Sequence, residues 1–468
     1  MINNFYHKIK QDIIFSYFFL LFSLIPISIL VGSAVSSINI IVISLSFLIY
    51  AFYSKNWQWL KSKNIKLLLI LYAYLVFNSL ISLDFNIGIN RNFGFIQYIL
   101  FFVAFNYFFL KYENFDKIFY VWLIIVVVVV LDVYLESFTG RNIMRPYFNE
   151  SHVQNRVFSF FIDEPKIGGY INCFFLLLTG YFLNVYQFKS NKLKYLIILV
   201  SVFSLTAIFL TGERAISIKA LLASLIFFTL SKKFSIKEKI ASYTIIILIF
   251  GIIYSKVDYI KYRYDQMIFK NLSSITHVVE YVKKTNFKPN TVDQFNISEE
   301  EAEIFYRSIG ANYFNLYISG FKVFIKYPLF GVGNKNYRIA TCTKYASDED
   351  GTVFYQLYKY NNTKKNELYN SQYVCNTHPH QIYFEFLAEH GIVGTLILLV
   401  IFFKLISQAL REIDFDKDSL QLAAFVLIIL SFLPFLPSGS FFSNYPATLF
   451  WINLSIMMTK SKSNNIFR

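Results

Sequence analysis

Long apolar blocks alternate with short polar segments along most of the 468-residue chain. A helix that crosses the hydrocarbon core of a bilayer needs about 20 apolar residues, and twelve blocks approach this length, several of them a little short. The blocks lie at about residues 13–31, 36–53, 67–83, 93–110, 118–135, 167–185, 195–211, 215–230, 240–255, 381–403, 419–433 and 441–458. This pattern predicts an all-α, polytopic membrane protein with about 12 transmembrane helices.

One connection is far longer than the others and runs from about residue 256 to residue 379. Its run 311–327 has the apolar periodicity of an amphipathic helix, whereas its stretch 344–373 is rich in Asn, Lys and Tyr and predicts irregular structure. We therefore expect a mostly helical loop domain between helices 9 and 10. The predicted organisation is helices 1–9 in residues 1–255, the loop domain in 256–379 and helices 10–12 in 380–468.

Positive charge is distributed unequally between the two sides that alternate along the predicted helices. With the amino terminus in the cytoplasm, the segments on that side hold 21 Lys and Arg residues, and the short segments on the other side hold six. The six are Arg91, Arg141, Arg145, Arg156, Lys166 and Arg214. Because Lys and Arg accumulate in cytoplasmic loops, the pattern predicts a multi-pass protein of the bacterial inner membrane, with both termini cytoplasmic and the long loop periplasmic.

The composition supports the same class. Hydrophobic residues make up 56% of the chain and charged residues 16%, whereas soluble domains average about 25% charged residues. There are therefore too few polar side chains to cover a water-soluble surface of this size. The formal net charge of +15 is largely the topology signal, with most of the rest in the long loop, and it requires no nucleic-acid partner.

The three cysteines have two different settings. Cys173 lies in a predicted membrane helix, where we expect it to act as a small apolar residue. Cys342 and Cys375 both lie in the long loop on the oxidising side, which favours a disulfide between them over two free thiols. No spacing such as C-x-x-C indicates a metal site, and none is predicted.

The segment 378–394, HPHQIYFEFLAEHGIVG, holds the clearest candidate for chemistry. Pro379 suits the first turn of a helix, where its missing N–H has no helical partner, so His380 is predicted in the first turn of the tenth membrane helix. The partial positive charge of a helix amino terminus disfavours imidazolium, and a general base must be a neutral imidazole near pH 7. In the alternative interpretation, His378 and His380 are interfacial polar residues that only cap the helix.

A helical projection at about 100° per residue gives His380 a packed face. The residues that share this face are Phe384, Leu387, Gly391 and Gly394. The two glycines are predicted to let a neighbouring helix approach closely. Glu389 falls on the opposite face, which makes it a poor candidate for a partner of His380.

A second candidate is Arg214, in the short connection TGER (211–214) between the seventh and eighth predicted helices. An arginine between two apolar spans is costly to place without a function, and its guanidinium matches phosphate oxygens with two parallel hydrogen bonds. Arg214 is therefore a candidate phosphate ligand. The alternative is an ordinary interfacial arginine that extends to water.

Two further polar segments carry weaker signals. The first, YPLFGVGNKNY (327–337), contains a G-x-G sequence that by itself favours a structural turn over a phosphate site. The second, RVFSFFIDEPKIGGY (156–170), places Asp163, Glu164 and Lys166 at the outer membrane surface. These three bind substrate or pair with each other, and their residue types alone favour pairing.

Together these segments resemble the O-antigen ligase and polymerase superfamily of bacterial membrane glycosyltransferases. The family pattern is an Arg-containing turn, a P-L-x-G-x-G segment in the large loop and an H-N-x-x-L-x-x-L-x-E-x-G-x-x-G motif that opens the next helix. The chain has TGERA (211–215), YPLFGVGNKNY (327–337) and HQIYFEFLAEHGIVG (380–394) in this order, and the segment 156–170 is similar to the one before the family's sixth span. The resemblance is clearest over residues 211–398.

The resemblance implies transfer of a glycan from undecaprenyl diphosphate to a sugar hydroxyl at the periplasmic face, without a nucleotide sugar, a metal or another cofactor. It implies that His380 activates the acceptor hydroxyl, and that Arg214 holds the diphosphate and stabilises it as it leaves. The neighbouring polar residues His378, Arg156 and Lys166 are expected to bind substrate.

The chain departs from the family pattern at two positions. Gln381 stands where the family has Asn and keeps the amide, so it is also expected to bind substrate. The family often has a second arginine shortly before the P-L-x-G-x-G turn, at a position that falls near Tyr313 here. The closest arginine, Arg307, is predicted to be the second diphosphate ligand, with Arg263 and Lys326 as alternatives.

The leading hypothesis is therefore an O-antigen ligase whose partners are an undecaprenyl-diphosphate-linked glycan, a lipid A core or glycan acceptor, and membrane lipids. The alternative is a polymerase of the same superfamily that joins lipid-linked repeat units. A polysaccharide transporter or flippase is more remote. Such transporters place ionisable residues near mid-bilayer, and only Lys219 and Asp132 approach that depth here.

Overall fold

The computed structural model describes residues 2–145, 156–161, 164–186, 191–265, 313–341, 376–414, 416–434 and 436–462, and within these ranges it is helical and contains no strand. The first helices are α1 (Ile2–Ser23), α2 (Ile25–Val31), α3 (Ser33–Tyr53), η1 (Gln58–Lys61), α4 (Lys63–Leu80), α5 (Phe85–Gly94), α6 (Ile96–Lys111), η2 (Phe115–Lys117) and α7 (Ile118–Thr139). The later ones are α8 (Ile167–Tyr186), α9 (Asn191–Leu210), α10 (Arg214–Leu230), α11 (Ile236–Lys256), α14 (Tyr313–Lys326), α15 (Tyr337–Thr341), α17 (Ile382–Glu412), α18 (Ser419–Ser431) and α19 (Asn444–Met458). A further helix, Asp258–Asp265, follows α11 at an angle of 100°.

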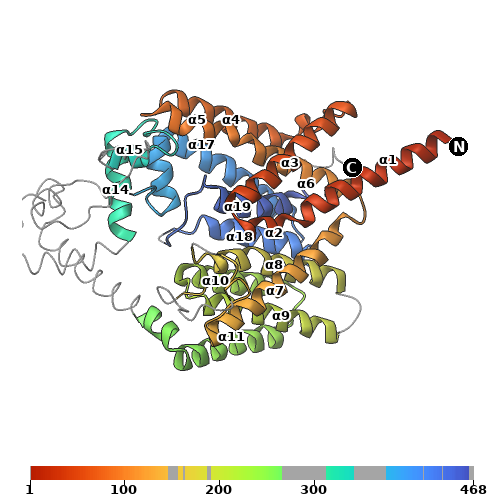
Figure 1. Ribbon diagram of the computed structural model, residues 1–468, viewed down its shortest axis with the longest axis vertical. Coiled ribbons are helices and arrows are strands. Elements are labelled where there is room, and N and C mark those ends of the chain that lie inside the picture. Colours follow the sequence, from red (N-terminus) through yellow and green to blue (C-terminus); the bar gives the residue numbers. More distant parts are fainter. Residues whose placement is uncertain are drawn as a thin grey trace, which may run out of the picture.

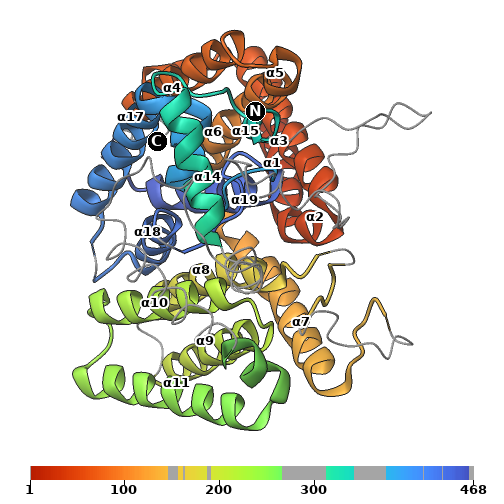
Figure 2. The same cartoon turned by 90° about the vertical axis from the view of Figure 1, so that its left-hand side faces the viewer.

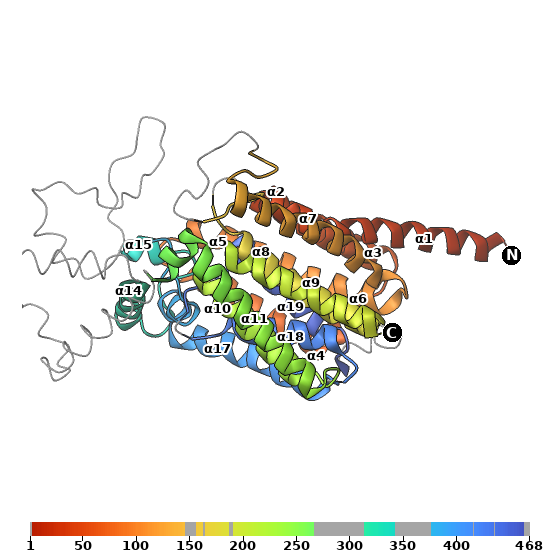
Figure 3. The same cartoon turned by 90° about the horizontal axis from the view of Figure 1, so that it is seen from below.

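The helices run side by side in an elongated bundle (Figure 1). Helices α14 and α15 lie at one end of it, and the start of α1 extends from the other end in both Figure 1 and Figure 3. Figure 2 looks onto the first end and shows α4, α5 and α17 above and α9, α10 and α11 below, with α18 and α19 between them. We call the end where α10 and α17 begin the site end, and the end where α8 finishes and α18 begins the far end.

Eight helices in the described part of the chain are long and apolar enough to cross a membrane. A ninth is added if α11 and the helix Asp258–Asp265 form one broken span. The prediction of a multi-pass, all-α membrane protein is thereby confirmed. The predicted number of 12 spans, their orientation and the domain boundaries stay predictions.

All twelve predicted blocks coincide with helices. Fewer than twelve of these helices are long enough to count as membrane spans, because three of them are short. Helices α10, α18 and α19 contain 17, 13 and 15 residues, which is short for a bilayer. The Val-rich block of α7 is helical although β-branched residues favour strands in water. In a bilayer a spanning segment must satisfy its backbone internally, and a helix does so. In the long loop, α14 confirms the helix predicted near 311–327.

Helix α17 is broken at Gly391, where φ is 62° and ψ is −167°. The segment 328–333 fills the break with four backbone hydrogen bonds. The N–H groups of Val332 and Gly333 donate to the carbonyls of Ala388 and Glu389, at 3.0 and 2.9 Å. The N–H groups of Ile392 and Val393 donate to the carbonyls of Pro328 and Leu329, at 2.8 and 3.1 Å. The groups that a break normally leaves without partners are thus satisfied by the inserted turn.

This break corrects the predicted face of the tenth membrane helix. A Cβ added at Gly391 would lie 2.4 Å from the backbone of Leu329, and one added at Gly331 would lie 2.4 Å from the backbone of Glu389. Gly391 therefore admits a turn of the loop domain and not a neighbouring helix. The projection that placed Gly394 on the face of His380 is wrong, because it assumed helical dihedral angles through Gly391.

Candidate functional site

A cavity of about 1770 Å³ lies at the site end of the bundle. Its walls come from α5, α8, α10, α14, α15, α17, α18 and α19, from the helix Asp258–Asp265 and from the segment 436–446. Among the described residues, those that line it include the basic Arg91, Arg156, Lys166, Arg214, Lys219, Arg263 and Arg338 and the acidic Glu164 and Glu213. A cleft with this excess of positive charge attracts anionic ligands.

His380 lines the cavity, but it lies outside the helix in which it was predicted. Helix α17 begins at Ile382, and the side-chain oxygen of Gln381 caps it by accepting the N–H groups of Tyr383 and Phe384 at 2.8 and 3.1 Å. The prediction that His380 occupies the first turn is wrong, because the cap falls one residue after it.

The backbone of His380 is strained and is held by its neighbours. Its φ of 58° is uncommon for a residue with a side chain, and its carbonyl oxygen accepts the N–H of Ser438 at 2.8 Å. Ring centroids lie 4.0 Å apart for His378 and His380, and 5.5 Å apart for Tyr313 and His380. Burial lowers the pKa of His380, so its imidazole is neutral near pH 7 and can accept a proton.

His378 also lines the cavity, and its imidazole is held neutral more strongly. Its Nδ1 lies 3.0 Å from the hydroxyl oxygen of Thr377. Burial lowers the pKa of His378 to about 3; the neighbouring His380 ring and the charges of Arg91 and Arg338 act in the same direction, and a hydrogen bond with Ser438 opposes them. At neutral pH this ring therefore acts as a hydrogen-bonding group beside His380.

Gln381 does not reach the cavity. Its side chain is 2% exposed, and its amide oxygen is engaged in the cap of α17. The expectation that Gln381 binds substrate is corrected by this placement, because the cap turns the amide into the protein.

Three guanidinium groups meet at the start of α10, and we call Arg156, Arg214 and Arg263 the α10 arginine group. Nη1 of Arg214 donates to the carbonyl of Arg263 at 3.3 Å, and Nε of Arg263 donates to the carbonyl of Gly212 at 2.9 Å. The charge of Arg156 acts on both of the other guanidinium groups. Three like charges repel each other in a partly buried place, so an anion would stabilise them.

The position of Arg156 is fixed by residues that follow it. The N–H groups of Phe158 and Ser159 donate to the Glu136 carboxylate at 3.1 and 2.6 Å. The hydroxyl of Ser159 donates to Asp132 at 2.5 Å. Asp132 was one of the two charged residues near mid-bilayer depth in the sequence. In the structure it anchors the segment that carries Arg156.

Glu213 is a member of the TGER turn that the sequence analysis did not single out. Its Oε1 accepts the N–H of Gly168, at the start of α8, at 2.6 Å. Burial raises the pKa of Glu213 to about 7, against the opposing effects of that hydrogen bond and of Arg156 and Arg263. This carboxyl group therefore changes charge near neutral pH, directly beside the α10 arginine group.

Lys166 lines the cavity and is paired at the same time. Its ammonium forms an ion pair with Glu164 and lies 5.7 Å from the ring centroid of Tyr445. The Tyr445 hydroxyl donates to the Lys166 carbonyl at 2.8 Å. The structure thus supports the pairing interpretation of this segment, while Asp163 lies outside the described residues.

The three candidates for a second diphosphate ligand differ in whether the structure places them at the cavity. Arg263 lines the cavity, whereas Lys326 does not and lies 5.6 Å from the ring centroid of Tyr327. Arg307, the predicted ligand, lies outside the described residues, as do Cys342 and Cys375 and hence the predicted disulfide. The described geometry favours Arg263.

A second set of basic residues was missed by the sequence analysis, and we call Arg91, Lys335 and Arg338 the α5–α15 basic group. Arg91 and Arg338 line the cavity, and the charges of both act on Lys335. Lys335 has a φ of 65°, a second strained backbone near the cavity. No local spacing links residues so far apart in sequence; the only signal was Arg91 among the six basic residues of the predicted outer side.

Comparison with known families gives one match. The family model described as O-antigen ligase matches residues 199–399, which is less than half of the chain. The matched part contains Arg214, Arg263 and His380, but not Arg91 or Arg156. The comparison with curated proteins found no match. The resemblance inferred from the motifs is confirmed by the family model.

Proposed function

We propose that the chain is a membrane glycosyltransferase of the O-antigen ligase and polymerase type, as the family match over residues 199–399 supports, and that it acts as a ligase. In this proposal it moves a glycan from undecaprenyl diphosphate to a lipid A core sugar at the periplasmic face of the inner membrane. The observation that carries the proposal is one cavity lined by a neutral, half-buried histidine and by the α10 arginine group.

His380 is the general base of the proposed reaction. The hydroxyl oxygen of the acceptor attacks the anomeric carbon of the donor glycan, and the neutral imidazole takes the hydroxyl proton. A base positioned in this way contributes about 10²–10⁴-fold to a rate. The bond between the anomeric carbon and the diphosphate oxygen breaks, and undecaprenyl diphosphate leaves with the electron pair.

The α10 arginine group stabilises the leaving diphosphate. Guanidinium groups donate pairs of hydrogen bonds to phosphate oxygens, and fixed positive charge is most effective where negative charge develops during the reaction. Arg214 and Arg263 are held in place by backbone carbonyls, so they are oriented before the donor binds. Glu213 sets the net charge of this group.

The direct test is His380→Ala in the full-length protein, scored for glycan transfer and for membrane insertion. Lys326→Ala is the matched control, because Lys326 is exposed and does not line the cavity. We expect the His380→Ala protein to insert normally and to lose transfer by about 10²-fold or more, and the control to keep it. Full transfer by an inserted His380→Ala protein would remove the proposed base.

The choice between ligase and polymerase is decided by the glycolipids of a deletion strain. Loss of a ligase leaves lipid-linked polymer and no capped lipopolysaccharide. Loss of a polymerase leaves lipopolysaccharide that bears a single repeat unit. The second result would replace the proposed acceptor with a lipid-linked repeat unit and would leave the roles of His380 and Arg214 unchanged.

A further inference from the structure

The α10 arginine group, and Arg91 and Arg338 of the α5–α15 basic group, line different walls of the cavity. The α10 arginine group lies on the side of α10 and α8, and the α5–α15 basic group lies on the side of α5 and α15. Figure 1 and Figure 2 place α10 below and α5 and α15 above in both views. His378 is close enough to Arg91 and Arg338 for their charges to act on it, and His380 contacts Tyr313, which is close to Arg214.

The α5–α15 basic group is built into a rigid frame of buried amides. Asn336 accepts the backbone N–H of Asp84 at 2.8 Å and donates to its carbonyl at 3.2 Å. Asn334 donates to the side-chain oxygen of Asn92 at 2.6 Å. All three asparagines are 0% exposed. The two segments are thus joined by residues next to Arg91 and on both sides of Lys335, so these basic side chains are fixed relative to each other.

The carboxylates nearest to this group lie behind the cavity wall. Glu385 and Glu389 of α17 are buried, and the charges of both carboxyl groups act on Arg91 or Lys335. Glu385 is engaged with Ser440 and the N–H of Phe441, at 2.5 and 2.9 Å. Neither glutamate lines the cavity, so a ligand in the cavity meets the basic side chains.

A single donor does not need both groups. A diphosphate diester carries two negative charges, and the α10 arginine group already offers three guanidinium groups. Arg91 and Arg338 lie close to His378, whose ring is beside His380, the base that must take the proton of the acceptor. Arginine side chains that line a partly enclosed cavity favour a second anion there.

We propose that the α5–α15 basic group binds an anionic substituent, a phosphate or a carboxylate, on the acceptor glycan. The proposal rests on the proposed function, because it assigns the two basic groups to donor and acceptor. It adds that the acceptor is recognised by its charge as well as by its sugar, and that donor and acceptor occupy separate anion sites at the same time.

The test uses the full-length protein in detergent with two probes, undecaprenyl diphosphate and inorganic phosphate. Undecaprenyl diphosphate is first bound to saturation, and phosphate binding is then measured by calorimetry. We expect phosphate to bind the saturated wild-type protein and to bind the variant R91Q/R338Q about tenfold or more weakly, since each charge-assisted hydrogen bond lost is worth roughly a factor of ten. Undecaprenyl diphosphate should bind this variant as it binds wild type, which also shows that the variant is folded. K335Q gives a milder second variant, and K326Q, which also removes one positive charge, is the control for K335Q.

Each outcome of the test has a definite meaning. Phosphate that fails to bind the saturated wild-type protein, or binds it and R91Q/R338Q equally, overturns the second site. Weaker binding of undecaprenyl diphosphate to R91Q/R338Q and K335Q, as in R214Q, assigns the basic group to the donor and also overturns the proposal. A wild-type protein that does not bind undecaprenyl diphosphate contradicts the proposed function instead.

The same variant identifies the source of the anion. Lipid A core acceptors with and without their phosphates are compared at saturating donor. We expect wild type to have a lower KM for the phosphorylated acceptor, and R91Q/R338Q to lose that difference without a matching loss of kcat. Equal KM values for the two acceptors in wild type, together with an unchanged KM in the variant, would contradict recognition of an acceptor charge.

Discussion

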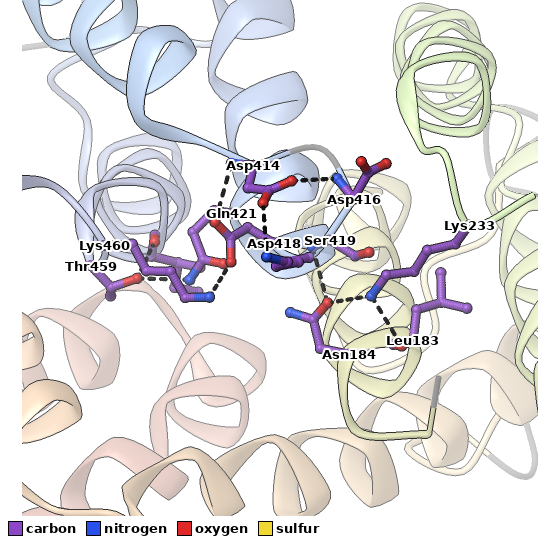
Figure 4. A network of polar contacts seen from close by, with 12 residues as sticks. Leu183, Asn184, Lys233, Asp414, Asp416, Asp418, Ser419, Gln421, Thr459 and Lys460 are labelled. Atoms are coloured by element: carbon purple, nitrogen blue, oxygen red, sulfur yellow. Dashed lines mark hydrogen bonds and ion pairs between the residues drawn. The ribbon is translucent and has the colours of Figure 1, made fainter. Parts of the chain in front are cut away.

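The two ends of the helix bundle use charged side chains in opposite ways. At the far end, basic side chains have close partners within the protein (Figure 4). Lys460 pairs with Asp418, and Lys233 donates to the side-chain oxygen of Asn184 at 2.8 Å. The same oxygen of Asn184 accepts the N–H of Ser419 at 3.0 Å. These contacts connect the end of α8 with the start of α18 and with the chain after α19, so charge at this end joins helices.

At the site end, positive charge gathers around a cavity. Within the described part of the chain its lining contains seven basic residues and two acidic ones, and one of the acidic residues, Glu213, has a pKa raised to about 7. Like charges in such a place destabilise the protein unless a ligand balances them. The comparison teaches that one end of the bundle gives up stability for binding, whereas the other end supplies stability. Four substitutions test this contrast.

The largest effect is expected for Arg214→Ala at the site end. Loss of one guanidinium that stabilises a leaving diphosphate should reduce kcat/KM for glycan transfer by about 10²–10³-fold. The matched far-end variant is Lys232→Ala, which removes an exposed ion pair with Asp416 at 3.3 Å. Such pairs contribute only about 0–1 kcal/mol, so transfer should be unchanged. Equal losses in the two variants would abolish the functional contrast between the ends.

The next effect is expected for Gly331→Ala, which disturbs the turn inserted into α17. The residue has a φ of 69°, and a Cβ would lie 2.4 Å from the backbone of Glu389. We expect a loss of about 2–3 kcal/mol in stability, measured as a lower Tm in detergent. Gly251→Ala in α11 is the control, since no atom lies within 4 Å of its added Cβ. An unchanged Tm for Gly331→Ala would show that the turn is not held as described.

A smaller effect is expected for Asp418→Ala at the far end. The change removes the partner of Lys460 and a carboxylate that accepts the backbone N–H of Asp414 at 3.2 Å. Stability should fall by about 1–2 kcal/mol, with the KM values for donor and acceptor unchanged. Lys417→Ala, which removes a more exposed pair at 3.8 Å, should have less effect on stability. A raised KM in Asp418→Ala would mean that the far end also shapes the site.

The smallest effect is expected for pH, through Glu213. Its pKa is raised to about 7, so the carboxyl group is mostly neutral below that pH and mostly ionised above it. Ionisation adds a negative charge beside Arg156 and Arg263, and the affinity for the lipid-linked glycan should therefore fall a few-fold as pH rises through about 7. The donor is a diphosphate diester and does not itself titrate in this range.

Glu213→Gln is the decisive variant for this dependence. It fixes the neutral form while keeping an oxygen that can accept the N–H of Gly168, so binding should stay tight and independent of pH. Glu164→Gln is the control, because Glu164 is exposed and paired with Lys166. An affinity for the lipid-linked glycan that rises with pH would show that another group titrates. The same conclusion would follow if the affinity of Glu213→Gln still fell as pH rises.

Much of this arrangement was predictable from the sequence, for reasons that are physical. The apolar blocks locate the helices because the length of a span is set by the bilayer. Arg214 and His380 were predicted to lie near each other because both stand at the ends of membrane helices on the same side of the membrane. Both line the cavity. His378, Arg156 and Lys166 line it as well.

The errors come from local geometry that a periodic pattern does not record. The start of α17 shifted by one residue because Gln381, an uncommon residue for a cap, supplies the capping oxygen. The predicted helix face is wrong beyond Gly391 because the turn 328–333, which lies far earlier in the chain, is inserted into α17 at that position. Arg91 and Arg338 were missed because the contacts that bring them together join segments distant in sequence, through Asp84 and Asn336.

The turn inserted into α17 has a mechanical consequence. Four backbone hydrogen bonds fuse the segment 328–333 to α17, and the rings of Tyr317 and Phe384 stack 5.4 Å apart across α14 and α17. Helix α14 and the first turns of α17 therefore form one rigid unit, and His380 lies directly before the cap of α17. A displacement of α14 would therefore also move the start of α17 and, through the hydrogen bond from the Ser438 N–H to the His380 carbonyl, the segment 436–446.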